Sequence, residues 1–250
     1  RMSINKPMLG HRVEEHEEVC ICMIDIVNFT KWSINKPAEV IFSTMSEFNQ
    51  LVLELLHNRR DVEKIEMVGD SMMVIGGLAN GCDDEVKCEM FQFVSDLLSR
   101  VRTLKRIFDY ESISLRVGMH MGTIHIGMIN GPRRIQVFGN AICVASRMES
   151  IACPGTVMIS HTLFESNYTN STLTGGKVVT MSVKGVGDIQ CKCLFLNTTN
   201  LNILVGDDLE MSTKLIVAKV NAVLRREIGA QFNVCAVNQM NSLYESMCSN

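Results

Sequence analysis

Two aspartates at the ends of apolar runs carry the chemistry that this sequence suggests. Asp25 ends the apolar run of residues 19–24, which is typical of a central strand covered on both faces. Asp70 follows the Val68-Gly69 turn between two further apolar runs, so we expect it at the tip of a hairpin. Two carboxylates at one end of a sheet would repel each other unless a cation lay between them. Paired Asp side chains suit Mg²⁺ or Mn²⁺ bound together with substrate phosphates.

The order of the predicted elements indicates that these two side chains meet. From residue 19 the pattern predicts a strand, a helix, a hairpin of two strands, a second helix and a further strand, with strands at residues 19–26, 62–67, 72–75 and 113–120. This is the split βαβ or ferredoxin-like plan of an α+β protein. Its first strand lies antiparallel beside its third, so the exit of the first strand and the hairpin share one sheet end. We therefore expect Asp25 and Asp70 to lie side by side.

The helices of this core have recognisable starts. One is expected to begin at Pro37 with Asn35 as its cap, and the other at Asp83, with apolar spacing that continues to Phe108. Residues 122–127 are expected to pair back on the strand before them as a hairpin. The later elements are expected to be a helix at 140–151, a strand at 156–159, a short helix at 160–166 and a last hairpin at 178–183 and 189–196.

Composition limits the class of protein and its partners. We expect residues 1–18 to be a polar linker, residues 19–197 to form one globular domain, and residues 198–250 to be a C-terminal extension with a helix around 209–228. A chain that starts at Arg1 is expected to be a piece of a longer protein. The net charge of −3, with both signs interspersed, argues against nucleic acid as a partner. No apolar run reaches the roughly 18 residues of a membrane span, so we expect no membrane contact by this domain itself.

The cysteines indicate a reducing compartment. Two pairs, Cys20 with Cys22 and Cys191 with Cys193, alternate along expected strands, where neighbours two apart do not have disulfide geometry. No Cys-x-x-Cys spacing typical of zinc occurs. We therefore interpret the ten cysteines as reduced, mostly buried thiols and expect a cytoplasmic location.

Four segments together resemble one enzyme family. Residues 19–30, 64–77, 138–150 and 183–187 are similar, in this order, to motifs of the class III nucleotidyl cyclase catalytic domain, which adenylyl and guanylyl cyclases share. The resemblance covers residues 19–196. It implies the class III cyclase fold, in which the ribose 3'-hydroxyl of a nucleoside triphosphate attacks its own α-phosphate and pyrophosphate leaves. It also implies a homodimer, because the family's active sites use residues of two chains, and a place in a larger signalling protein.

The resemblance assigns a metal and phosphate site to the first two motifs. Asp25 and Asp70, with the carbonyl of Ile26, are implied to hold two divalent ions, Mg²⁺ or Mn²⁺. The short loop that ends in Phe29 and Thr30 precedes a helix, so its backbone N–H groups are expected to face the substrate phosphates.

The last two motifs imply the residues that act on the transferring phosphoryl group. Arg147 matches the family's arginine that faces the developing charge. Lys184 matches the triphosphate-binding lysine, although Val186 stands where the family often has a second lysine. Cys143 stands where the family has an asparagine that orients the ribose, and a thiol is a weak hydrogen-bonding group.

Two positions are implied to read the base. Family guanylyl cyclases have Glu at the position of Glu66 and adenylyl cyclases have Lys, and a carboxylate accepts hydrogen bonds from the N1–H and amino group of guanine, whereas adenine N1 would face it as another acceptor. A buried mismatch of this kind costs about 1–3 kcal/mol. The second position falls on Gln136, whose amide both donates and accepts. GTP is therefore the expected substrate, in place of ATP.

Other interpretations stay open at this point. The domain could be an adenylate cyclase, or a weakly active or inactive nucleotide-binding partner because of Cys143. A palm relative such as a diguanylate cyclase shares the strand plan and the paired acids, but the chain has no Gly-Gly-Asp/Glu-Glu-Phe signature. Taken singly, Glu66 and Arg147 are ordinary solvated charges.

Overall fold

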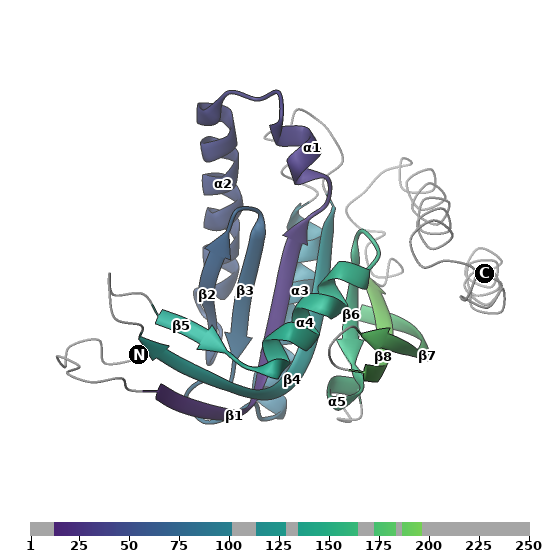
Figure 1. The fold of residues 1–250 in the computed structure, drawn as a ribbon. Coiled ribbons are helices and arrows are strands. Elements are labelled where there is room, and N and C mark those ends of the chain that lie inside the picture. The colour runs from purple at the N-terminus through teal and green to yellow at the C-terminus, as the bar shows by residue number, and fades with distance from the viewer. Residues whose placement is uncertain (1–12, 102–113, 129–134, 165–172, 184–186, 197–250) are drawn as a thin grey trace. The chain divides into compact units, whose positions relative to one another are not determined.

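The computed structural model describes residues 13–101, 114–128, 135–164, 173–183 and 187–196 (Figure 1). All of them belong to one compact unit, residues 1–196. The expected C-terminal extension and its helix at 209–228 lie outside the described residues, so they stay predictions. Within the described part, no helix is both long enough and apolar enough to span a membrane.

The described strands form one sheet whose faces carry helices (Figure 1). The elements are β1 (Val13–Ile26), α1 (Phe29–Ser33), α2 (Ala38–Leu56), β2 (Val62–Val68), β3 (Ser71–Gly76), α3 (Asp84–Arg100), β4 (Leu115–Met128), β5 (Ile135–Phe138), α4 (Asn140–Ile151), β6 (Thr156–Ser160), α5 (His161–Phe164), β7 (Leu173–Val183) and β8 (Gly187–Leu196). The strand order is β2-β3-β1-β4-β6-β8-β7, with β5 paired to β4. The β4–β6 pair is parallel and the other pairs are antiparallel.

The predicted α+β plan with a ferredoxin-like core is confirmed. Strands β1 to β4 and helices α2 and α3 follow the expected βαββαβ order, and β1 lies between β3 and β4. Ile24 pairs with Met72 on one side, and Asp25 pairs with Arg116 on the other. The exit of β1 is therefore at the same sheet end as the turn between β2 and β3.

Two expectations about strands were wrong. β1 begins at Val13, so residues 13–18 are strand and not linker; they pair with β4 across a bulge between His16 and Val19, and most of their side chains are exposed, which hid the strand in a polar sequence. Residues 122–127 do not fold back as a hairpin, because β4 runs unbroken through Gly122, which has no positive φ and pairs with Val19. The strand that returns along this part of β4 is β5.

Helices α2 and α3 each start one residue after the expected position. The cap of α2 is Pro37 and not Asn35. Asp83 caps α3, since its carboxylate accepts a hydrogen bond from the Val86 N–H at 2.8 Å. This helix is described to Arg100, and the expected continuation toward Phe108 falls in residues 102–113, outside the described part.

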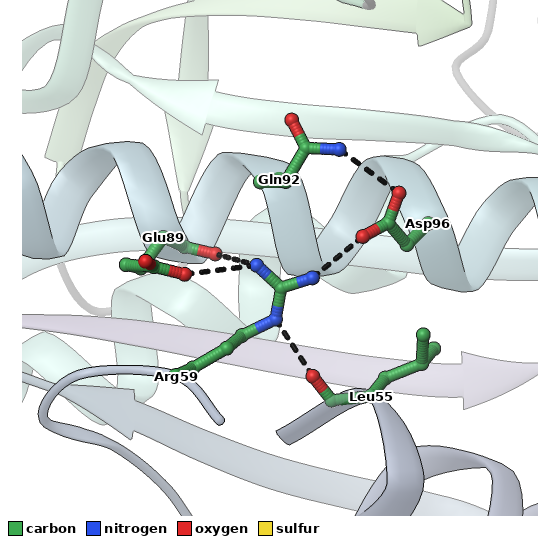
Figure 2. Close-up of polar contacts among 5 residues, drawn as sticks. All are labelled: Leu55, Arg59, Glu89, Gln92 and Asp96. Atoms are coloured by element: carbon green, nitrogen blue, oxygen red, sulfur yellow. Dashed lines mark hydrogen bonds and ion pairs between the residues drawn. The ribbon is translucent and has the colours of Figure 1, made fainter. Parts of the chain in front are cut away.

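Helices α2 and α3 cover one face of the sheet and are joined by Arg59 (Figure 2). The Arg59 guanidinium donates to the Leu55 carbonyl at 2.7 Å, to the Glu89 carboxylate at 3.0 Å and to the Asp96 carboxylate at 2.5 Å. It also lies 6.0 Å from the centre of the Phe93 ring. Because the guanidinium is mostly buried, these charge-assisted contacts hold the end of α2 against α3.

Helix α4 covers the other face of the sheet and approaches β4 very closely (Figure 1). A Cβ atom at Gly118 would lie 2.0 Å from the Glu149 nitrogen and 2.3 Å from the Ala145 carbonyl oxygen. Only glycine leaves room for helix backbone at this position. The contact fixes the C-terminal half of α4 over the strand that carries Arg116.

Candidate active site

Asp25 lies at the end of the central strand with both carboxylate oxygens engaged. The residue is 9% exposed. Oδ1 accepts a hydrogen bond from the Ser71 hydroxyl at 3.1 Å, and Oδ2 accepts one from the Arg116 guanidinium at 2.5 Å. A neighbour on each side of β1 therefore orients this carboxylate.

Asp70 occupies the turn between β2 and β3. Val68 pairs with Ser71, so Gly69 and Asp70 form a two-residue connection, and Gly69 takes a φ of +62° that favours glycine. Burial and the negative charge of Asp25 raise the pKa of Asp70, and the positive charge of Arg116 partly offsets this. The expected meeting of Asp25 and Asp70 is thus present in the fold.

Arg116 and Glu149 join this pair and were missed from the sequence. Arg116 Nε lies 3.0 Å from Glu149 Oε1, an ion pair by distance that lacks the alignment of a hydrogen bond. Burial raises the pKa of Glu149 to about 7, a shift that Arg116 opposes and Asp25 adds to. Arg116 could have been noticed as a lone charge in the apolar strand beside Asp25, whereas Glu149 gives no sequence signal because its place depends on how α4 packs.

The acidic end of the sheet fits a hard divalent cation. Asp25, Asp70 and the Ser71 hydroxyl supply oxygen atoms, which Mg²⁺ and Mn²⁺ prefer. The pKa of Asp70 is raised by burial and by the like charge of Asp25, and a cation would relieve the repulsion between the two charges. In the part of the chain that is described, no group of three or more His, Cys, Asp or Glu has metal-site geometry. Further ligands would therefore be substrate phosphates, water or the backbone carbonyl of Ile26, a buried residue that pairs with Leu115.

The predicted phosphate loop is short and enters α1. Asn28 has a left-handed φ of 63°, and Phe29 and Thr30 are the first residues of the helix. The Val27 N–H already donates to the Ser114 carbonyl at 2.9 Å, which leaves the amides at the start of α1 as candidates. The Phe29 ring packs 5.6 Å from that of Trp32 and anchors this turn.

The two predicted base-reading residues lie on other strands. Glu66 is exposed on β2, next to a bulge after Lys64, and Gln136 is half-buried on β5 opposite Gly127. Among the residues that the structure describes, neither side chain forms a hydrogen bond or an ion pair with Asp25 or Asp70.

The remaining predicted residues lie on the outer side of α4 or outside the described part. Cys143 and Arg147 are exposed and one helical turn apart, on the face opposite to the buried side chains of this helix. No hydrogen bond or ion pair of the described chain links them to Asp25 or Asp70. Lys184 lies outside the described residues.

The chain is similar to known cyclases in sequence. Residues 11–198 match the sequence model of the family described as adenylate and guanylate cyclase catalytic domain. The germination-specific adenylate cyclase of Dictyostelium discoideum is 31% identical over 157 residues, which cover 61% of this chain and 18% of that protein. Guanylate cyclase 2G of Rattus norvegicus is 32% identical over 187 residues, 70% of this chain and 16% of that protein. The chain thus spans less than a fifth of these relatives.

Solved structures share the fold at lower identity. The guanylate cyclase domain of RhGC from Catenaria anguillulae, solved with GTP, superposes with a TM-score of 0.66 at 24% identity and covers 74% of this chain and 99% of that one. The adenylyl cyclase CyaB from P. aeruginosa superposes with a TM-score of 0.64 at 17% identity, over 74% and 97%. The fold therefore does not distinguish the two nucleotides. The match over residues 11–198 shows that this chain belongs to the adenylate and guanylate cyclase catalytic domain family.

Proposed function

We propose that the chain is a guanylate cyclase that converts GTP to 3',5'-cyclic GMP and pyrophosphate. The proposal rests on one observation above all: the fold brings the carboxylates of Asp25 and Asp70 together at one sheet end. In the reaction the ribose 3'-hydroxyl loses its proton to water and its oxygen bonds to the α-phosphorus. The bond from that phosphorus to the bridging oxygen of the β-phosphate breaks, and pyrophosphate leaves.

Asp25 and Asp70 would hold the cations of this reaction, with the Ile26 carbonyl as a further ligand. Two divalent ions, Mg²⁺ or Mn²⁺, would lower the pKa of the 3'-hydroxyl and neutralise charge on the triphosphate. The Ser71 hydroxyl orients Asp25, so that one of its carboxylate oxygens keeps a fixed direction.

Cationic groups of the chain would stabilise the charge that develops on the phosphates. Arg116 lies beside Asp25 and can reach a triphosphate held there. Arg147 is exposed and takes the role that its motif implies, at the transferring phosphoryl group. Lys184 and the amides at Phe29 and Thr30 would bind the remaining phosphate oxygens.

Glu66 supports GTP as the substrate. Its carboxylate is exposed and has no hydrogen bond or ion pair among the described residues, so it is available to accept from the N1–H and amino group of guanine. Gln136 would take the second base-reading role through its amide, which can donate to guanine O6. The guanylate cyclase relatives agree with this choice, whereas the similar Dictyostelium protein is named as an adenylate cyclase.

Two chains would complete each site, which predicts a homodimer. Asp25 is buried and Asp70 is half-buried within one chain, whereas Glu66, Cys143 and Arg147 face outward. Exposed apolar side chains at Val68, on the turn side of β2, and at Phe138, on β5, favour burial against a second copy. A two-fold arrangement would give two equivalent sites.

We infer that this domain works as one cytoplasmic module of a larger signalling protein. A receptor-type guanylate cyclase of Caenorhabditis elegans is 28% identical over 156 residues, which are 12% of its length. The chain would thus supply the catalytic part of such a protein.

A turnover assay tests the proposal directly. The purified chain is incubated with GTP or ATP in the presence of Mn²⁺ or Mg²⁺, and the cyclic products are separated by chromatography. We expect cyclic GMP to exceed cyclic AMP by about tenfold or more. Cyclic AMP as the main product would make the chain an adenylate cyclase, and no product from either nucleotide would contradict the proposal.

A second candidate, a weakly active nucleotide-binding partner domain, is favoured by Cys143. Its thiol lies one turn before Arg147 on the same exposed face of α4, where a weak hydrogen-bonding group would orient the ribose poorly. Cys143→Asn separates the two: a rise in kcat of about tenfold or more supports impairment, and an unchanged kcat shows that the thiol is tolerated.

A further inference from the structure

We propose that Glu149 is a positioning residue for Arg116. It holds the guanidinium at the edge of the carboxylate pair. Arg116 can then release its hydrogen bond to Asp25 and bind a substrate triphosphate without leaving the site. This inference rests on the proposed function, because it assigns a role within the same site.

Arg116 uses different parts of its guanidinium for its two acidic neighbours. Nη2 donates to Asp25 Oδ2 at 2.5 Å, and Nε lies 3.0 Å from Glu149 Oε1. Asp25 is also the group proposed to bind a cation, so its contact with Arg116 must be exchangeable. Glu149 is not one of the proposed cation ligands, so it stays beside Arg116 when Nη2 is released from Asp25.

The backbone of Glu149 is fixed relative to Arg116. Arg116 and Gly118 are two apart in β4, so they lie on the same face of the sheet. Helix α4 packs on that face with the Glu149 nitrogen only 2.0 Å from where a Cβ atom of Gly118 would lie. The positions of Arg116 and Glu149 are therefore fixed by one rigid contact between β4 and α4.

Packing alone gives no reason for an acid at residue 149. Its side chain is 12% exposed and lies near two other carboxylates, where a third negative charge is unfavourable without a cation. Arg116 is the cation that offsets part of this cost. The same charge draws the guanidinium away from a complete pairing with Asp25, which would otherwise compete with a divalent ion.

Binding of inorganic triphosphate with Mn²⁺, measured by calorimetry on the whole chain, tests this role without turnover. We expect Glu149→Gln to weaken binding about tenfold and Arg116→Gln at least as much. If Glu149 acts through Arg116, adding Glu149→Gln to Arg116→Gln should change the affinity less than about twofold. Glu47→Gln, the same charge change on the exposed face of α2, should leave it within about twofold.

The outcomes separate this role from a structural one. An unchanged triphosphate affinity with a lowered unfolding temperature would mean that the ion pair only joins α4 to β4, and the inference would be overturned. So would an equal effect of Glu149→Gln with and without Arg116. If Glu149→Gln does not fold, Glu149→Asp, which keeps the charge one methylene short, serves in the same comparison. If the unmodified chain binds no triphosphate, the proposed function itself fails, and the inference fails with it.

Discussion

The acidic end of the sheet and the outer face of α4 differ in the burial and the hydrogen bonding of their polar side chains. At the sheet end Asp25 is buried and both of its oxygens are engaged by side chains of the same chain, Ser71 and Arg116. On α4, Cys143 and Arg147 are exposed, and within the described residues no hydrogen bond or ion pair links them to either acid. A preorganised acid pair needs only a cation, whereas exposed groups need something outside the chain to order them. Under the proposed function, one chain would supply a metal half that is finished apart from its cations and their remaining ligands, and an unfinished nucleotide half.

The largest effect should come from the finished half. Asp25→Asn removes a proposed metal ligand and one of the two carboxylate charges that would attract the cations, so cyclic GMP formation should fall by at least about a thousandfold. Arg147→Ala should also be nearly inactive. Mixed together, the two variants should recover about a quarter of the normal rate, because half of the dimers would be mixed and each would have one intact site. Absence of recovery in dimers shown to be mixed would place both residues in one chain's site.

A second test disrupts the close contact between β4 and α4 beside the finished half. Gly118→Ala places a methyl group against the backbone of α4, so the free energy of unfolding should fall by about 3 kcal/mol. Gly69→Ala is the control, since it has a positive φ but open space and should cost about 1 kcal/mol. Urea unfolding measures both. Equal losses would mean that α4 moves aside easily.

The unfinished half should control the choice of base. Glu66→Lys replaces an acceptor by a donor at an exposed position, so the ratio of kcat/KM for GTP over ATP should fall by about ten- to a hundredfold. The stability should stay the same, because Glu66 has no hydrogen bond or ion pair among the described residues. Glu63→Lys, another exposed charge of β2, is the matched control. An unchanged ratio would remove Glu66 from base recognition.

The two halves also differ in how far the sequence predicted them. The meeting of Asp25 and Asp70 follows from strand order alone, because a ferredoxin-like plan puts the first strand beside the hairpin. The helix at 140–151 was predicted with its observed bounds, since its apolar spacing is regular. Local pattern and topology are thus enough for the carboxylate pair.

Other features of the fold and the site depend on packing between distant segments, which the local sequence pattern does not reveal. The polar start of β1 is a strand only because β4 is long enough to pair with it, and β4 is long because Gly122 stays extended instead of turning. The link between Arg116 and Glu149 requires α4 to touch the sheet at Gly118. Each of these is a contact between distant segments, which spacing along the chain does not reveal.

The smallest predicted effect concerns His120, further along β4 within the buried region. Its Nδ1 lies 2.7 Å from the Ser160 hydroxyl, and burial lowers the pKa of His120 to about 4. Between pH 6.5 and 4 the unfolded chain therefore binds more protons than the folded chain, so the stability that neutral His120 gives above pH 6.5 is lost as the pH falls. From pH 7 to pH 5 the free energy of unfolding should drop by about 2 kcal/mol or less from this group.

His120→Gln should remove this part of the pH dependence, whereas His125→Gln, on the exposed part of the same strand beside Glu15, should leave it in place. Urea unfolding at pH 7 and pH 5 measures the difference. If His120→Gln keeps the full slope, the imidazole is protonated without cost in the fold, and water must reach this part of β4. The contrast between buried polar groups in the sheet and exposed polar groups on α4 would then hold near Asp25 but not along the whole of β4.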